Sequence, residues 1–177
     1  MGDTRRWLER AVIGLNLCPF AKAVYVKQPD ALRARATRST TRGAAERAGR
    51  GTGAAARRPG RTVDTTLIVH PEVLTDFLDY NDFLDNADAA VEALDLQGIL
   101  QVASFHPHYQ FAGTAPDDIG NYSNRSPYPT LHLLREDSVE RAVAAFPDPD
   151  VIVERNLETL GEAGLEGWKR ALEGRDS

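Results

Sequence analysis

The sequence predicts a single-domain α/β protein, with helices packed on a mixed sheet of about four or five strands. Three observations support this fold class. Segments with the apolar period of a helix alternate with short runs rich in β-branched residues. The 177 residues are enough for one domain with its own core. The single cysteine, Cys18, excludes an internal disulfide, so the core must hold the fold together.

The first half of the chain contains one predicted helix and two predicted strands. Asp3 or Thr4 can cap a helix whose apolar residues follow the helical period up to Pro19. The alternating residues 23–27 predict a short strand, and residues 64–70 predict a second one.

The second half contains further helices and two more strands. Apolar residues at steps of three or four in 72–96 predict one broken helix or two short ones. Residues 99–105 are apolar on both faces and predict a central strand, and 130–135 predict the fourth strand. Helices should follow from Asp137 and from Asp148.

Two histidines stand at the ends of two of these strands. We expect strands 64–70 and 99–105 to run parallel through a right-handed crossover, because a helix lies between them. Their carboxyl ends, His70 and His106, would then share one edge of the sheet. Ligands of open α/β sheets bind outside such strand ends. His106 and His70 are therefore the predicted acid–base pair, and capping of strand-end carbonyls is the alternative.

The long polar segment 104–132 supplies the remaining site candidates. It is rich in hydrogen-bonding groups and contains few aliphatic residues, as is typical of a functional loop on a rigid scaffold. Arg125 offers a planar fork for a carboxylate or phosphate. Asn121 and Asn124 could orient a polar substrate, or could stabilise their own turns. Tyr109 either contacts the ligand or anchors the loop to the core.

Metal binding and thiol chemistry are less well supported. His106 and His108 form an HxH pair, but no acidic residue stands at the spacing of a zinc helix motif. We therefore assign no metal, and the sequence identifies no cofactor. His132 lies inside a strand and is interpreted as a buried, hydrogen-bonded residue. Cys18 is interpreted as a small buried hydrophobe.

Residues 29–62 form an anomalous segment rich in Arg, Ala and Gly. It holds nine arginines and two acids, and its one large apolar residue is Leu32. Such a composition predicts disorder. The alternatives are a pair of compensating frameshifts in a GC-rich gene, a solvated linker, or a basic arm that touches nucleic acid or acidic lipid. The whole chain, including this basic segment, has a net charge of −5, so the residues outside the segment are acidic. Nucleic-acid binding is therefore not the expected function.

The cellular setting is predicted from what the sequence lacks. No apolar run approaches the roughly 20 residues of a membrane span, and the N-terminus has no signal-peptide pattern. We expect a soluble, cytoplasmic protein. The sequence does not define its oligomeric state.

Several long motifs resemble a known family. They include WLERAVIGLNLCPFAKAVYVK, DTTLIVHPEVLTDFLDYNDFLD and LQVASFHPHYQFAGTAPDDIGNYSNRSPYPTLHLLRE. Over residues 7–28 and 63–157 the chain resembles the bacterial domain-of-unknown-function family 1415. The resemblance implies no particular activity. It implies a strand and an amphipathic helix where this chain has 29–62, which supports the frameshift interpretation. It also implies that His108 is often replaced by an acid.

The function expected from the sequence is that of an enzyme, a hydrolase or group-transfer catalyst, acting on a small polar or anionic substrate. His106 and His70 would supply acid–base chemistry, and Arg125 would hold the anion. The alternative is a non-catalytic ligand-binding or protein-interaction module. The expected partner is a small-molecule ligand.

Overall fold

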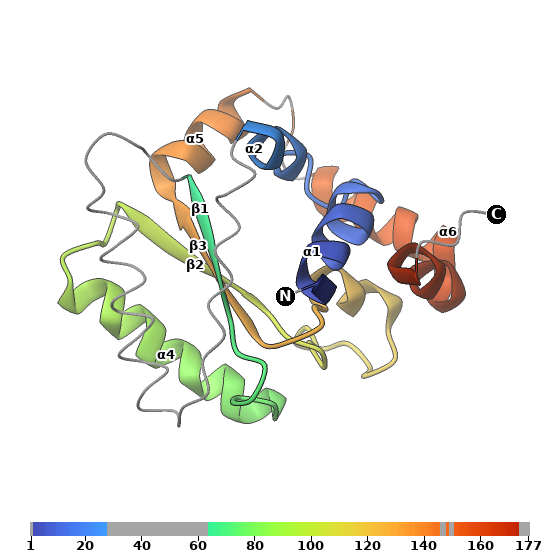
Figure 1. Cartoon of the computed structure of the whole chain (residues 1–177), viewed down its shortest axis with the longest axis horizontal. Helices are drawn as coiled ribbons and strands as arrows, with labels where there is room; N and C mark the ends of the chain where they lie inside the picture. The colour runs from blue at the N-terminus through green and yellow to red at the C-terminus, as the bar shows by residue number, and fades with distance from the viewer. Residues whose placement is uncertain (1, 28–63, 146–147, 149–150, 174–177) are drawn as a thin grey trace.

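The computed structural model describes residues 2–27, 64–145, 148 and 151–173 (Figure 1). The predicted anomalous segment, 29–62, lies outside these residues. The described elements, in chain order, are α1 (Gly2–Trp7), η1 (Leu8–Ile13), α2 (Ala21–Lys27), β1 (Thr65–Val69), α4 (Phe77–Ala93), β2 (Leu100–Phe105), η3 (Ile119–Asn124), β3 (Thr130–Arg135), α5 (Glu136–Ala144) and α6 (Val151–Glu173).

The sheet has three strands in the described part of the chain, in the order β1-β3-β2. Both outer strands run antiparallel to β3, and Val69 and Phe105 are both registered with Thr130. β1 and β2 therefore point the same way and end at one edge, as predicted. The prediction of a mixed sheet of four or five strands is not confirmed, because the described residues form three strands. β1 and β2 run in the same direction, but β3 lies between them and pairs with each, so both observed pairings are antiparallel.

The strand predicted at 23–27 is wrong, because these residues belong to helix α2. The helix begins just after Pro19, where Ala21 N donates to Cys18 O at 3.1 Å and Val24 N to Phe20 O at 3.4 Å. An alternating apolar run of five residues fits one and a half turns of helix as well as a strand. The local pattern therefore could not decide between them.

Helix α4 covers one face of the sheet. Within the predicted 72–96 region it is continuous from Phe77 to Ala93, and Asp76 caps its first turn by accepting bonds from two backbone amides. Its buried residues, Tyr80 and Phe83, pack on Ile68 and Leu131 of the sheet. The apolar stripe predicted from the sequence is thus the stripe that the structure buries.

The opposite face of the sheet packs against helices from both ends of the chain. Trp7 and Ala11 from the N-terminal helices and Leu160 and Trp168 from α6 join one core cluster with strand β1. In Figure 1 α4 lies on one side of the sheet, and α1 and α6 lie on the other. α6 kinks at Gly164, whose φ of 61° favours glycine. No helix in the described residues has the length and apolar character needed to cross a membrane.

Candidate functional site

The two predicted catalytic histidines follow the ends of β1 and β2. His70 N donates to Pro129 O at 2.8 Å, and His106 N donates to Asn124 O at 3.2 Å. The central strand β3 lies between the two strands that these histidines follow. The structure thus brings both histidines to one edge, on either side of the central strand.

His106 is completely buried, and both of its ring nitrogens contact backbone groups. Nε2 lies 3.1 Å from Leu74 O, and Nδ1 accepts a bond from His108 N at 3.0 Å. The ring therefore carries its proton on Nε2. Burial lowers the pKa of His106, so the ring is neutral at pH 7. Its partner Leu74 has a φ of 59°, which is strained for a leucine. This hydrogen bond stabilises an unusual turn before α4.

His70 is also completely buried, and its ring lies 6.4 Å from that of Phe83. Burial lowers its pKa from 6.5 to about 4. The imidazole is therefore neutral at physiological pH. The proposed acid–base role of His70 and His106 stays a prediction, and it would have to operate from two buried, neutral rings.

The predicted amides are tied to the polar loop itself. The side chain of Asn121 is fully buried and makes three hydrogen bonds: Oδ1 accepts from Phe111 N and Thr114 Oγ1, and Nδ2 donates to Ala115 O. Asn124 Nδ2 donates to the carbonyl oxygen of Ser104 at 3.2 Å. Asn121 therefore fixes the turn at 111–115, and Asn124 joins the loop to β2.

Arg125 and Tyr109 lie next to each other in the polar loop. Arg125 Nε donates to Tyr109 O at 3.3 Å, and Nη2 donates to Pro116 O. The guanidinium also stacks over the Tyr122 ring, with its carbon 4.2 Å from the ring centroid. The Tyr109 ring packs against Phe77 of α4. Arg125 thus cross-links the loop, and its stem remains at the surface of a neighbouring pocket.

A metal centre does not emerge in the described residues. No group of three His, Cys, Asp or Glu side chains converges there. His106 and His108 have ring centroids 5.9 Å apart, and the first ring is already engaged at both nitrogens.

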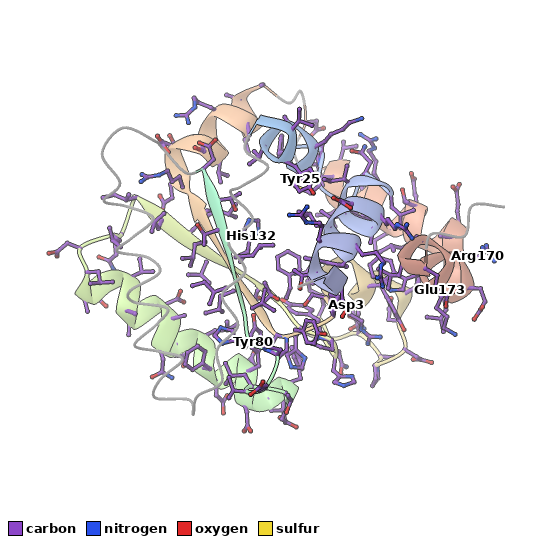
Figure 2. The ribbon with its side chains drawn as sticks, viewed as in Figure 1. Asp3, Tyr25, Tyr80, His132, Arg170 and Glu173 are labelled. Atoms are coloured by element: carbon purple, nitrogen blue, oxygen red, sulfur yellow. The ribbon has the colours of Figure 1, made fainter. Side chains whose placement is uncertain are left out.

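His132 and Cys18 have the environments that the sequence predicted. His132 Nε2 is hydrogen-bonded to Thr65 Oγ1, and burial lowers the pKa of the ring to about 4. Cys18 is half-buried, and burial raises the pKa of its thiol. Figure 2 shows His132 on the side of the sheet that faces α1 and α2.

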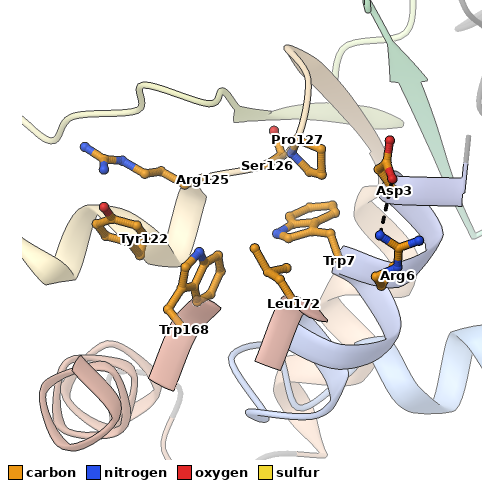
Figure 3. Close-up of a pocket in the computed structure, with 9 residues that line it drawn as sticks. All are labelled: Asp3, Arg6, Trp7, Tyr122, Arg125, Ser126, Pro127, Trp168 and Leu172. Atoms are coloured by element: carbon orange, nitrogen blue, oxygen red, sulfur yellow. Dashed lines mark hydrogen bonds and ion pairs between the residues drawn. The ribbon is translucent and has the colours of Figure 1, made fainter. Parts of the chain in front are cut away.

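A pocket of about 280 Å³ lies beside the polar loop, between the N-terminal helices and α6 (Figure 3). We call it the aromatic pocket. Its lining residues are Asp3, Arg6, Trp7, Tyr122, Arg125, Ser126, Pro127, Trp168 and Leu172. The rings of Tyr122 and Trp168 meet edge to face at 5.6 Å. The pocket is therefore walled by large flat side chains from distant parts of the sequence.

The aromatic pocket contains a buried donor without a partner. Trp7 is 2% exposed, and its Nε1–H makes no hydrogen bond among the described residues. In Figure 3 this nitrogen is on the side of the indole that faces Trp168 and Leu172. Buried N–H groups are nearly always satisfied in native proteins. This donor is therefore an unsatisfied polar group in the wall of the aromatic pocket.

Comparison with known families gives one match. The model of the family described as "Protein of unknown function (DUF1415)" matches residues 1–170. The chain belongs to the DUF1415 family. No curated protein and no solved structure matches it.

Sequence reasoning missed the aromatic pocket of this DUF1415 chain. Trp7 and Trp168 lie in segments with helical periodicity, which indicates only that they belong to the core, and both are nearly buried. The available signal was chemical, because a buried tryptophan needs a partner for its N–H. It indicates a pocket only when the folded structure shows that Trp7 and Trp168, near opposite ends of the chain, lie together.

Proposed function

We propose that this chain is a non-catalytic binding module for a small, flat molecule that carries a carboxylate, held in the aromatic pocket. This develops the second of the two functions expected from the sequence. The observation that carries the proposal is the buried, unpartnered Nε1–H of Trp7 in that pocket.

The indole N–H supports an acceptor group on the ligand. A buried donor without a partner costs the protein about 1–3 kcal/mol. A carboxylate oxygen placed against Trp7 Nε1 would remove this cost and would form a charge-assisted bond. Binding therefore gains energy from a group that the folded protein leaves unsatisfied.

The walls of the pocket support a flat ligand body. Trp168 is 5% exposed and Tyr122 is half-buried, so both rings are held by packing before any ligand arrives. Rigid aromatic walls favour stacked or edge-to-face contacts with another ring. The volume of about 280 Å³ is close to the lower end of ligand sites, which limits the ligand to a small molecule.

The charges around the pocket support an anion. Arg6 and Arg125 line it together with one acid, Asp3, whose carboxylate accepts bonds from Arg6 and from Tyr128 Oη. The guanidinium of Arg125 points away from Trp7 in Figure 3, so it contributes positive potential but no direct contact. The excess of one positive charge favours a carboxylate over a neutral ligand.

Calorimetric titration with 2-naphthoate and 2-naphthamide tests the proposal. The two probes have the same ring system, and only the first carries a charge. We expect naphthoate to bind more tightly, and Trp7→Phe to weaken its binding about tenfold, as expected for one hydrogen bond of about 1.4 kcal/mol. The matched control is Tyr109→Phe, which alters an aromatic residue outside the pocket.

Two results would count against the proposed function. If naphthoate and naphthamide bind with equal affinity, the pocket does not recognise a carboxylate. If Trp7→Phe and the unaltered chain bind naphthoate with equal affinity, the indole N–H does not contact the ligand. Circular dichroism of each variant verifies that it remains folded.

A further inference from the structure

A second cavity, of about 300 Å³, lies on the face of the sheet opposite α4. We call it the apolar cavity. Among its lining residues are Val24 of α2, Leu67, Ala103 and Leu134 of the three strands, and Val139 of α5. It is therefore lined by side chains from the three described strands and from helices α2 and α5. Its chemistry differs from that of the aromatic pocket, although Trp7 lines both.

The polar groups at the edges of this cavity are mostly paired with one another. Ser138 Oγ donates to Asp64 Oδ1 at 2.8 Å, and Tyr25 Oη donates to Glu9. The Cys18 thiol is neutral, because burial raises its pKa. The described residues that line the cavity include no Lys or Arg, and their one acid, Asp64, is hydrogen-bonded to Ser138.

Among the described residues that line the cavity, His132 offers a hydrogen-bond acceptor, whereas the unpartnered Nε1–H of Trp7 is a donor. His132 lines it, and the ring uses Nε2 to contact Thr65 Oγ1. Thr65 Oγ1 in turn donates to Leu133 O at 3.2 Å, so its only proton is committed and Nε2 must be the donor. Nδ1 of a neutral ring then carries a lone pair, and it makes no hydrogen bond among the described residues.

We propose that the apolar cavity binds a small, predominantly aliphatic molecule with a single hydroxyl group, which donates its proton to His132 Nδ1. The aliphatic body would contact Leu67, Leu134 and Val139. A hydroxyl fits because it is uncharged and supplies the one donor that Nδ1 needs. A carboxylate fits less well, since it would lose its hydration against an acceptor lone pair, and Arg141 of α5 is engaged by Ser138 and Asp137.

The strength of the expected interaction follows from two terms. Burial of an alkyl chain contributes about 0.8 kcal/mol for each methylene group. A single neutral hydrogen bond to a buried acceptor adds roughly tenfold in affinity. Chain length should therefore set the affinity, and the hydroxyl should set the preference among ligands of equal length.

Titration of the full chain with 1-decanol and with decanoate at pH 7 tests this proposal, followed by calorimetry or native mass spectrometry. We expect decanol to bind, and decanoate to bind at least tenfold more weakly. Ala103→Leu places added methyl groups in the cavity and should abolish decanol binding. Ala89→Leu, at an exposed position on α4, makes the same change elsewhere and should leave binding unaltered.

A second variant isolates the hydrogen bond. His132→Phe keeps a ring in the strand and removes Nδ1, so it should weaken decanol binding about tenfold while leaving decane binding unchanged. Naphthoate should not compete with decanol, because the two ligands occupy different cavities. This makes the test independent of the proposed function.

Three results would overturn the proposal. They are tighter binding of decanoate than of decanol, equal decanol affinity of Ala103→Leu and Ala89→Leu, and no decanol binding up to its solubility. A fourth result would also contradict the proposal. If the protein self-associates at high concentration and thereby loses decanol binding, the cavity is occupied by a second copy of the chain.

Discussion

Lowering the pH from 7 to 5 should destabilise this protein, because its buried histidines are folded in the neutral form. Burial lowers the pKa of both His70 and His132 from 6.5 to about 4. Between these two values the unfolded chain binds protons that the folded chain does not bind. The stability that depends on the neutral rings is therefore fully present above pH 6.5, and it is lost as the pH falls towards 4.

The size of the effect follows from these pKa values. Between pH 7 and pH 5 each of the two rings should lower the free energy of unfolding by about 2 kcal/mol, so the pair lowers it by about 4 kcal/mol. Burial also lowers the pKa of His106, which acts in the same direction. A loss of this size is a large part of the 5–15 kcal/mol that stabilises an ordinary domain.

Urea denaturation followed by circular dichroism at pH 7 and pH 5 measures the difference. His70→Gln and His132→Gln should each lower stability at pH 7, and each should remove about half of the pH-dependent loss. A pH-dependent loss below about 1 kcal/mol in the unaltered chain would refute the reasoning. The same conclusion would follow if the double variant kept the full pH dependence.

Two further substitutions test the packing around the site. Tyr80→Phe should lower the free energy of unfolding by about 2–3 kcal/mol, measured by urea denaturation, because the buried Tyr80 hydroxyl donates to Thr130 O at 2.8 Å and accepts from Phe105 N at 3.2 Å. Gly120→Ala should cost about 1 kcal/mol, since its Cβ would lie 2.8 Å from Leu157 Cδ2. Adding Leu157→Ala should reduce that cost in a double-mutant cycle.

Matched variants make these two tests specific. Tyr25→Phe removes an exposed hydroxyl and should change stability by less than about 0.5 kcal/mol. Gly161→Ala adds a methyl group with no neighbour within 4 Å and should raise the helical stability of α6 by up to about 1 kcal/mol. Equal effects in test and control variants would contradict the assigned contacts.

The parts of the fold that depend on local pattern could be predicted from the sequence. The apolar stripe of α4 was recognised because it repeats over several turns, and strands β1, β2 and β3 were each placed to within a residue or two. Residues 23–27 misled the prediction because five residues do not define a period. The order of the strands could not be predicted, because pairing with β3 joins residues distant in sequence.

The polar loop could be recognised from the sequence, but the partners of its side chains could not. The polar loop was recognised from composition, yet nothing in the sequence shows that Asn121 bonds to Phe111 and Thr114 of the same loop. The aromatic pocket depends on Trp7 and Trp168, which lie near opposite ends of the chain. Tertiary contacts of this kind follow from the folded arrangement and not from spacing.

The position of β3 in the sheet constrains how the chain can fold. Among the described strands, β3 is the last to be synthesised and also the central one, and its register joins Thr65 to Leu134 across most of the described sequence. β1 and β2 therefore leave the ribosome before the strand with which both of them pair, and the edges that β3 covers stay open until residues 130–135 emerge. Truncation before Thr130 should yield an insoluble product, whereas removal of the far end of α6 should leave the sheet able to form.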